Sequence, residues 1–290
     1  MHAVSPSYAE EILSPSDIDE RGFHGGEGLE ADLRDAHEQG RLFGILNGCE
    51  YPRTKKSGAG GWKALLGKMH QQVPLWTGAS KTPDKTHTIA LSRLNQLDND
   101  RPGMILTSVG RITGQKIGLM IQPTSDGRPA LDCILEELDG QGLLLMVGSG
   151  DAAIESFLTE VAARFDNFIF LRGYSEELAD ALYTLGDLFF MPSSYEPCGI
   201  SQMLALRAGQ PCLVHGVGGL RDTVQDSVTG FLFNGDYPTD QADNLVSTLR
   251  RALSLFRQNP ATWQALRKAA AAKRSDWADS VDRYLEHLYQ

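Results

Sequence analysis

Two basic residues, Arg111 and Lys116, lie five positions apart directly after an apolar run at residues 104–109. Two cations on one loop could bind a diphosphate, because guanidinium and ammonium groups donate charge-assisted hydrogen bonds to phosphate oxygens. The alternative is a pair of solvated surface charges, which contribute little to stability. Spacing alone does not separate the two interpretations.

A glycine-rich segment follows the next apolar run. Residues 148–153 fit the G-x-G-x-x-G/A pattern through Gly148 and Gly150, which would let the backbone approach a ligand closely. In a dinucleotide-binding unit, the following strand should end in an acidic residue that binds the ribose. Residues 167–171 are followed instead by Arg172, so a nicotinamide cofactor is a minor alternative.

A carboxylate, Glu196, lies just before Pro197 and a predicted helix. Proline favours an extended conformation for the residue that precedes it. The carboxylate is either a favourable charge at the end of a helix or a ligand for sugar hydroxyls. Cys198 is interpreted as a small buried thiol and not as a nucleophile, because no histidine lies near it in the sequence.

Adjacent glycines, Gly218 and Gly219, precede a short predicted helix within residues 215–222. Free N–H groups at such a point can bind an anion. The alternative is an ordinary glycine-rich turn. His215, at the start of this segment, is more often a hydrogen-bonded histidine than a catalytic one.

These segments need a scaffold that brings the ends of several strands together. From residue 103 onward, six apolar runs predict strands at residues 104–109, 143–147, 168–171, 188–191, 212–214 and 230–233. Helical patterns lie at residues 129–138, 151–165, 176–186, 199–209, 240–257, 261–273 and 277–289. This alternation predicts an α/β fold with a Rossmann-like, doubly wound parallel sheet, whose ligands bind beyond the carboxyl ends of the strands.

Residues 1–100 are less regular. We expect a short strand at residues 42–46, a helix at residues 62–69, and otherwise polar, irregular chain between residues 52 and 100. This part is predicted to be peripheral and to lack a convincing core of its own.

The amino-acid composition excludes several classes of binding partner and location. The 290 residues carry 27 Lys and Arg against 37 Asp and Glu, a formal net charge of −10, and a negative field repels nucleic acid. No run of about 18 apolar residues suits a membrane span, and the first residues do not resemble a secretory signal. The four cysteines have neither metal-ligand nor disulfide-framework spacing. We expect a cytoplasmic protein with reduced thiols and no bound metal.

Taken together, these segments resemble the bacterial glycogen synthase and plant starch synthase group, family 5 retaining glycosyltransferases of the GT-B fold. Residues 110–116 resemble its R-x-T-x-Q-K segment, residues 191–199 its P-S-x-x-E-P-C-G signature, and residues 217–224 its T-G-G-L-x-D-T-V motif. Residues 4–12 and 44–48 resemble upstream segments, so the resemblance covers most of the chain.

The resemblance implies transfer of glucose from ADP-glucose to an α-1,4-glucan, with retention of configuration and without a metal or other cofactor. Arg111 and Lys116 would hold the donor diphosphate, Glu196 would bind hydroxyls of the donor glucose, and Tyr174 would stack on adenine. The remaining donor-site residues would be Gly148, Gly150, Cys198, Gly199, Ser201, Val217, Gly218, Gly219 and Leu220. The residues do not distinguish ADP-glucose from UDP-glucose.

The resemblance also implies a domain organisation. Residues 1–100 would be a remnant of the N-terminal glycosyltransferase domain with a linker, residues 101–274 the nucleotide-sugar-binding domain, and residues 275–290 a helix that crosses back to the N-terminal domain. Most of that first domain would then be missing, so we expect donor binding but impaired catalysis by the isolated chain. The alternatives are a non-catalytic half that needs a separate N-terminal partner, and a truncated product.

Overall fold

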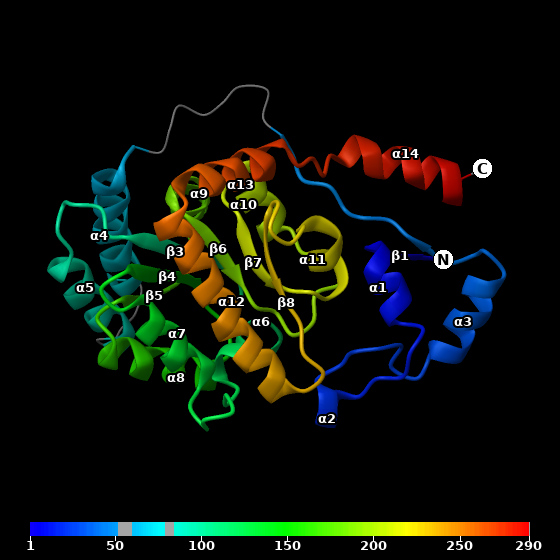
Figure 1. Cartoon of the computed structure of the whole chain (residues 1–290), viewed down its shortest axis with the longest axis horizontal. Helices are drawn as coiled ribbons and strands as arrows, with labels where there is room; N and C mark the ends of the chain where they lie inside the picture. Colours follow the sequence, from blue (N-terminus) through cyan, green and yellow to red (C-terminus); the bar gives the residue numbers. More distant parts are fainter. Residues whose placement is uncertain (52–59, 79–83, 290) are drawn as a thin grey trace.

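A six-stranded parallel sheet lies at the centre of the molecule, and a two-stranded parallel sheet lies near the N-terminus (Figure 1). The computed structural model describes residues 1–51, 60–78 and 84–289. Within those ranges no helix is long and apolar enough to cross a membrane.

The strand order of the large sheet is β5-β4-β3-β6-β7-β8. Its strands are β3 (Met104–Val109), β4 (Gly142–Gly148), β5 (Phe168–Arg172), β6 (Leu188–Met191), β7 (Cys212–His215) and β8 (Gly230–Phe233). The order reverses between β3 and β6, and such a switch point opens a ligand crevice at the carboxyl ends of the two strands. The predicted Rossmann-like sheet is confirmed, with each of the six expected strands in place.

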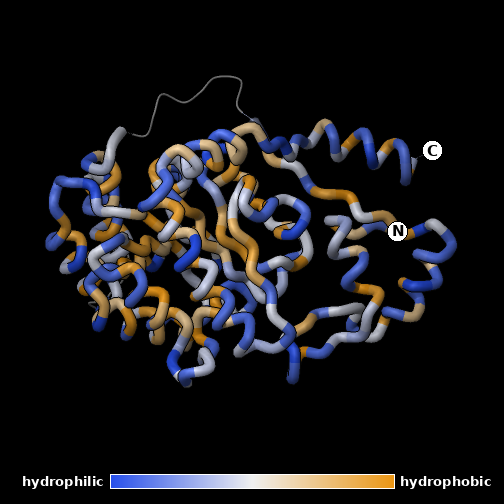
Figure 2. Tube along the Cα trace, viewed as in Figure 1, coloured by the Kyte–Doolittle hydropathy of each residue, from blue (hydrophilic) through white to orange (hydrophobic). Residues whose placement is uncertain are grey.

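Helices cover both faces of this sheet. They are α6 (Gly114–Ile121), α7 (Ala130–Leu138), α8 (Ala152–Arg164), α9 (Glu176–Leu185), α10 (Ser201–Arg207), α11 (Gly218–Thr223), α12 (Pro238–Gln258) and α13 (Pro260–Ala272). Leu106 belongs to one apolar cluster and its neighbour Ile105 to another, because successive strand residues point to opposite faces. Figure 2 shows hydrophobic residues concentrated along the strands.

Two helices precede the sheet in sequence, α4 (Trp62–Gly78) and α5 (Lys85–Gln96), and they pack beside β5 and α9. The sequence predicted a helix only at residues 62–69, so the expectation of irregular chain here was wrong. Leu65, Met69 and Val73, four residues apart, bury one stripe of α4. Pro74 inside α4 weakens the helical signal, because proline lacks the N–H that a helix interior needs.

The N-terminal part forms a small layer of its own. It contains β1 (His2–Ala3), α1 (Pro6–Glu11), α2 (Ile18–Arg21), α3 (Glu30–Glu38) and β2 (Phe43–Gly44), and β1 pairs with β2. Helix α1 contacts α11 of the large domain. Ser7 donates to the Asp222 carboxylate twice, from its N–H at 2.9 Å and from its hydroxyl at 2.7 Å. The N-terminal layer is therefore tied to the glycine-rich segment at residues 215–222.

The last helix, α14 (Trp277–Leu288), lies against this N-terminal layer (Figure 1). The Ser280 hydroxyl donates to the carbonyl oxygen of Leu46 at 2.6 Å. The Tyr284 hydroxyl lies 3.0 Å from His2 Nε2. Three apolar side chains of the same helix remain exposed to solvent, namely those of Trp277, Val281 and Leu285.

Candidate functional site

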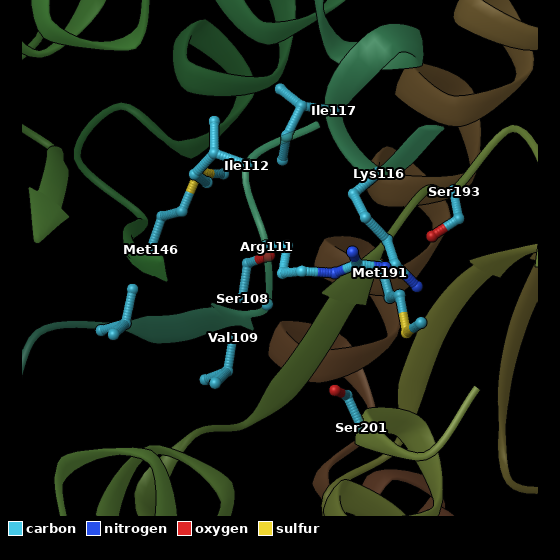
Figure 3. Close-up of a pocket in the computed structure, with 12 residues that line it drawn as sticks. Ser108, Val109, Arg111, Ile112, Lys116, Ile117, Met146, Met191, Ser193 and Ser201 are labelled. Atoms are coloured by element: carbon cyan, nitrogen blue, oxygen red, sulfur yellow. The ribbon is translucent and has the colours of Figure 1, made fainter. Parts of the chain in front are cut away.

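A cavity lies at the switch point of the sheet, between the carboxyl ends of β3 and β6 (Figure 3). Arg111 and Lys116 line it from the loop after β3 and the first turn of α6, and Ser201 lines it from the start of α10. The structure therefore brings three of the predicted site residues to one cavity, although they span 90 positions of the chain.

The cavity also contains Ser193, which the sequence analysis did not single out. Ser193 is fully buried, and its hydroxyl has no hydrogen-bond partner among the described residues. A buried polar group left unpaired is costly, so a polar ligand group in the cavity would stabilise this hydroxyl. The carbonyl oxygen of Ser193 lies 3.2 Å from His215 Nδ1, which donates to it.

His215 is the buried, hydrogen-bonded histidine that the sequence predicted. Burial lowers its pKa to about 4, so the imidazole is neutral near pH 7. Its ring stacks on Phe233 with centroids 4.9 Å apart. His215 thus supports the loop after β6 and carries no charge into the cavity.

Lys116 and Glu196 form an ion pair through Lys116 Nζ and Glu196 Oε2. Both side chains are largely buried, with 19% and 8% of their surface exposed. Burial, assisted by the nearby Arg111 charge, lowers the pKa of Lys116 to about 8. A phosphate in the cavity would compete with Glu196 for this ammonium group.

Helix α6 and the loop after β6 hold each other in place. The carbonyl oxygen of Gln115 accepts from the Ser194 N–H at 2.9 Å. The Gln115 side-chain amide donates to the carbonyl oxygen of Tyr195 at 2.6 Å. The loop that carries Glu196 is therefore fixed by the residue next to Lys116, which explains why the two charged groups meet.

The glycine pair at residues 218 and 219 fits against the Glu196 loop. The Gly219 N–H donates to the carbonyl oxygen of Glu196 at 3.0 Å. A Cβ atom at Gly219 would overlap the backbone of Cys198, and one at Gly218 would overlap the carbonyl oxygen of Glu196. Glycine at these two positions therefore allows the segment that begins at Gly218 to pack closely against the loop that carries Glu196.

The Gly218 N–H donates to Glu11 Oε1 of helix α1 at 2.8 Å. The resemblance assigned this amide to the donor diphosphate, and in this structure a carboxylate oxygen occupies it. Burial raises the pKa of Glu11. Sequence reasoning missed Glu11, because nothing local relates it to a glycine 207 positions away.

Gly148 and Gly150 also permit contact between loops. A Cβ atom at Gly148 would overlap the carbonyl oxygen of Gly110, and one at Gly150 would overlap that of Ile112. The Ile112 N–H in turn donates to the carbonyl oxygen of residue 149 at 3.0 Å. Because Arg111 lies between the two contacts, these glycines hold the loop that presents its guanidinium.

The nicotinamide alternative finds little support at the same loop. The Gly150 N–H donates to Glu155 at 2.7 Å, and Asp151 caps α8 by accepting from two N–H groups of its first turn. These amides are therefore paired with carboxylates of the chain. Arg172, at the position where a ribose-binding acid would stand, pairs with Asp84.

The remaining predicted residues lie around the cavity and do not line it. Cys198 is buried, and burial raises the pKa of its thiol, as expected for a structural cysteine. Gly199 and Val217 lie in the two interlocked loops, and Leu220 lies in α11. Tyr174 follows β5 at the same edge of the sheet and is 68% exposed. In the part of the chain that the structure describes, no group of three or more potential metal ligands occurs.

Comparison with known proteins finds similarity to glycosyltransferases. Residues 129–251 match the family described as "Glycosyl transferases group 1". The chain is 36% identical to a glycogen synthase of Thioalkalivibrio sulfidiphilus (strain HL-EbGR7), over 99% of this chain and 54% of the relative. It is 33% identical to the glycogen synthase of Vibrio atlanticus (strain LGP32), over 98% of this chain and 54% of the relative.

Solved structures agree on the fold. The catalytic domain of starch synthase IV from Arabidopsis thaliana, bound to ADP and acarbose, superposes with a TM-score of 0.66. That similarity covers 99% of this chain and 54% of the plant protein at 23% identity. The Anabaena protein HepE, in complex with UDP and glucose, gives a TM-score of 0.58 at 16% identity, over 90% of this chain and 61% of its own.

The sheet order, the cavity at its switch point and these matches define a domain of the GT-B glycosyltransferase class. More narrowly, the chain is similar over almost its whole length to bacterial glycogen synthases. The chain spans about half the length of the curated relatives it matches.

The contact between the two motif loops is testable with a pair of glycine substitutions. Gly219→Ala is expected to destabilise the protein by about 1–3 kcal/mol, since the new methyl group overlaps backbone that cannot rotate away. Gly118→Ala in α6 has open space and is expected to stabilise by about 0.5–1 kcal/mol. Denaturant unfolding measures both, and equal effects of the two substitutions would contradict the interlocked arrangement.

The lowered pKa of Lys116 predicts how diphosphate binding depends on pH. The protonated ammonium binds anions, and the proton is lost as the pH rises through about 8. Affinity for ADP, measured by calorimetry between pH 7 and 9, is therefore expected to fall with rising pH. Lys116→Gln should bind more weakly and show no such fall, and a flat wild-type profile would refute this role for Lys116.

Proposed function

We propose that this chain binds ADP-glucose at the switch-point cavity and contributes the donor half of a retaining, metal-independent glucosyl transfer to an α-1,4-glucan. The observation that supports this most directly is the meeting of Arg111, Lys116 and Ser201 in one cavity with Glu196 paired to Lys116. Two cations beside a buried carboxylate suit a ligand that carries phosphates at one end and a polyhydroxylated ring at the other.

In the proposed reaction, the bond between the glucose C1 and the diphosphate oxygen breaks, and a new bond forms between C1 and the hydroxyl oxygen at the non-reducing end of the glucan. The proton of that hydroxyl passes to the departing ADP. Negative charge develops on the departing ADP. Arg111, Lys116 and the Gly218 amide would stabilise that charge, which is the kind of preorganised electrostatic contribution that dominates many enzymes. When ADP-glucose binds, before the transfer, its diphosphate would displace Glu196 from Lys116 and Glu11 from the Gly218 amide.

After this exchange Glu196 would accept hydrogen bonds from hydroxyls of the donor glucose. Tyr174, exposed at the same edge of the sheet, would stack on the base. The starch synthase IV structure contains ADP, which supports an adenine nucleotide as the ligand here. The HepE structure contains UDP and glucose, so UDP-glucose is the competing donor to be tested.

The same proposal includes slow transfer by the chain alone. The chain matches about half the length of the glycogen synthases, and transfer in a GT-B enzyme needs donor and acceptor oriented from two sides. The alternatives are a nucleotide-sugar-binding half that acts with a separately encoded N-terminal partner, and a truncated product without function.

Calorimetry with ADP tests the donor site. Wild-type chain is expected to bind ADP in the micromolar range, and Arg111→Ala is expected to reduce the affinity by about 10- to 100-fold because a charge-assisted contact is lost. Arg34→Ala on α3 is the matched control, since that residue is exposed and lies on a helix of the N-terminal layer. An ADP affinity unaffected by Arg111→Ala would refute the assigned site, and no binding by the wild type would favour the truncated product.

Transfer itself is tested by adding radiolabelled ADP-glucose and glycogen to the purified chain. Little or no label is expected to enter the polymer, because the chain alone supplies one side of the reaction site. UDP-glucose in a parallel reaction compares the two donors. Incorporation at the rate of a full-length glycogen synthase measured side by side would contradict the impairment.

A further inference from the structure

Residues 172–174, at the end of β5 and just after it, are covered by helices α4 and α5, which both lie outside the matched family region. Trp76, in the last turn of α4, lies directly over Gly173. A Cβ atom at Gly173 would come within 2.6 Å of the indole atoms Cδ2 and Cε2. The indole therefore occupies the space that a side chain at position 173 would need.

The backbone of Gly173 is held from the other side as well. Its N–H donates to the carbonyl oxygen of Gly148 at 3.1 Å, so it is joined to the loop that positions Arg111. Its φ angle is +154°, a value that residues with a side chain rarely adopt. Gly173 is thus fixed between Trp76 and the Gly148 loop.

His87 of α5 holds the preceding residue. Its Nε2 donates to the carbonyl oxygen of Arg172 at 2.8 Å, and the residue is only 3% exposed. His87 Nδ1 lies 3.1 Å from the carboxylate of Asp84, which also pairs with the Arg172 guanidinium. The His87 ring stacks against the Trp76 indole, with centroids 6.3 Å apart and planes inclined by 29°.

These contacts fix the main chain immediately before Tyr174, whose own side chain is 68% exposed. Tyr174 and Ser201 of the cavity both lie near enough to Tyr183 to influence the pKa of its phenol, which burial raises. The exposed ring therefore belongs to the edge of the same site. An aromatic ring on a fixed backbone stacks on a ligand with a smaller entropy loss than one on a mobile loop.

We propose that Trp76 is a positioning residue for the nucleotide base, holding Gly173 so that Tyr174 is presented for stacking. The inference rests on the proposed function, because it assumes that a nucleotide binds beside Tyr174. It makes α4 a part of the nucleotide site, although this helix precedes the sheet and contributes no residue to the cavity lining.

The experiment measures binding of two probes, ADP and inorganic pyrophosphate, by calorimetry. Trp76→Ala is expected to weaken ADP binding about 3- to 10-fold, a part of the roughly 5- to 100-fold that loss of one stacking ring causes, and to leave pyrophosphate binding unchanged. Trp76→Phe keeps a ring over Gly173 and should bind ADP almost as wild type does. Leu75→Ala is the matched control, because Leu75 is next to Trp76 in the sequence and is 67% exposed.

Coupling between the two aromatic residues is tested with Tyr174→Ala. The double variant Trp76→Ala/Tyr174→Ala is expected to bind ADP no more weakly than Tyr174→Ala alone, because Trp76 acts through Tyr174. Additive losses would overturn the inference. So would equal losses of ADP and pyrophosphate affinity in Trp76→Ala, which would indicate only a structural role.

A spectroscopic measurement does not depend on the folding of Trp76→Ala. Trp62 and Trp263 are buried, and the exposed Trp277 lies on α14, at the opposite end of the molecule from α4 (Figure 1). ADP is therefore expected to change wild-type tryptophan emission mainly through Trp76, and Trp76→Phe should lose that change. An undiminished response in Trp76→Phe would contradict the inference. If wild type binds neither probe, the proposed function fails and the inference with it. If wild type binds both and Trp76→Ala binds ADP equally well, the inference alone fails.

Discussion

Direct contact between backbones at the carboxyl edge of the sheet is the constraint on which the site depends. Gly148 and Gly150 touch the loop that carries Arg111, and Gly219 touches the loop that carries Glu196. Each contact is possible only because no Cβ atom stands between the chains. The charged groups belong to different strands, and this close packing of their loops brings them within reach of one ligand.

The electrostatics of the site follow from that packing. Lys116 is paired with Glu196, and the Gly218 amide is paired with Glu11, so these two groups already hold carboxylates of the chain. A negatively charged protein thereby keeps a locally balanced cavity. Anion binding at such a site is an exchange of one negative partner for another, and its free energy is a difference between two charged interactions.

The sequence predicted the part of the fold in which local pattern and tertiary structure agree. The strands after residue 103 were found within one or two residues of their ends, because apolar runs alternate there with helical periodicity. Helix α5 was not predicted. Helix α4 was predicted nine residues too short, because Pro74 weakens the helical pattern of its last turns. Arg111, Lys116 and Glu196 were recognisable from their motifs. Glu11, Ser193 and Trp76 were not, because their importance comes only from contacts distant in sequence.

The contact between α14 and β1 has a consequence for how the molecule opens. Tyr284 and His2 meet at 3.0 Å, so segments from opposite ends of the sequence form one patch of structure. Local unfolding proceeds in cooperative units, and fraying of α14 would remove one of the contacts that hold β1 in the N-terminal layer. That layer carries Glu11, which occupies the Gly218 amide. Hydrogen exchange in the last helix is thereby expected to be coupled to that of the segment around Gly218, through the N-terminal layer that contacts both.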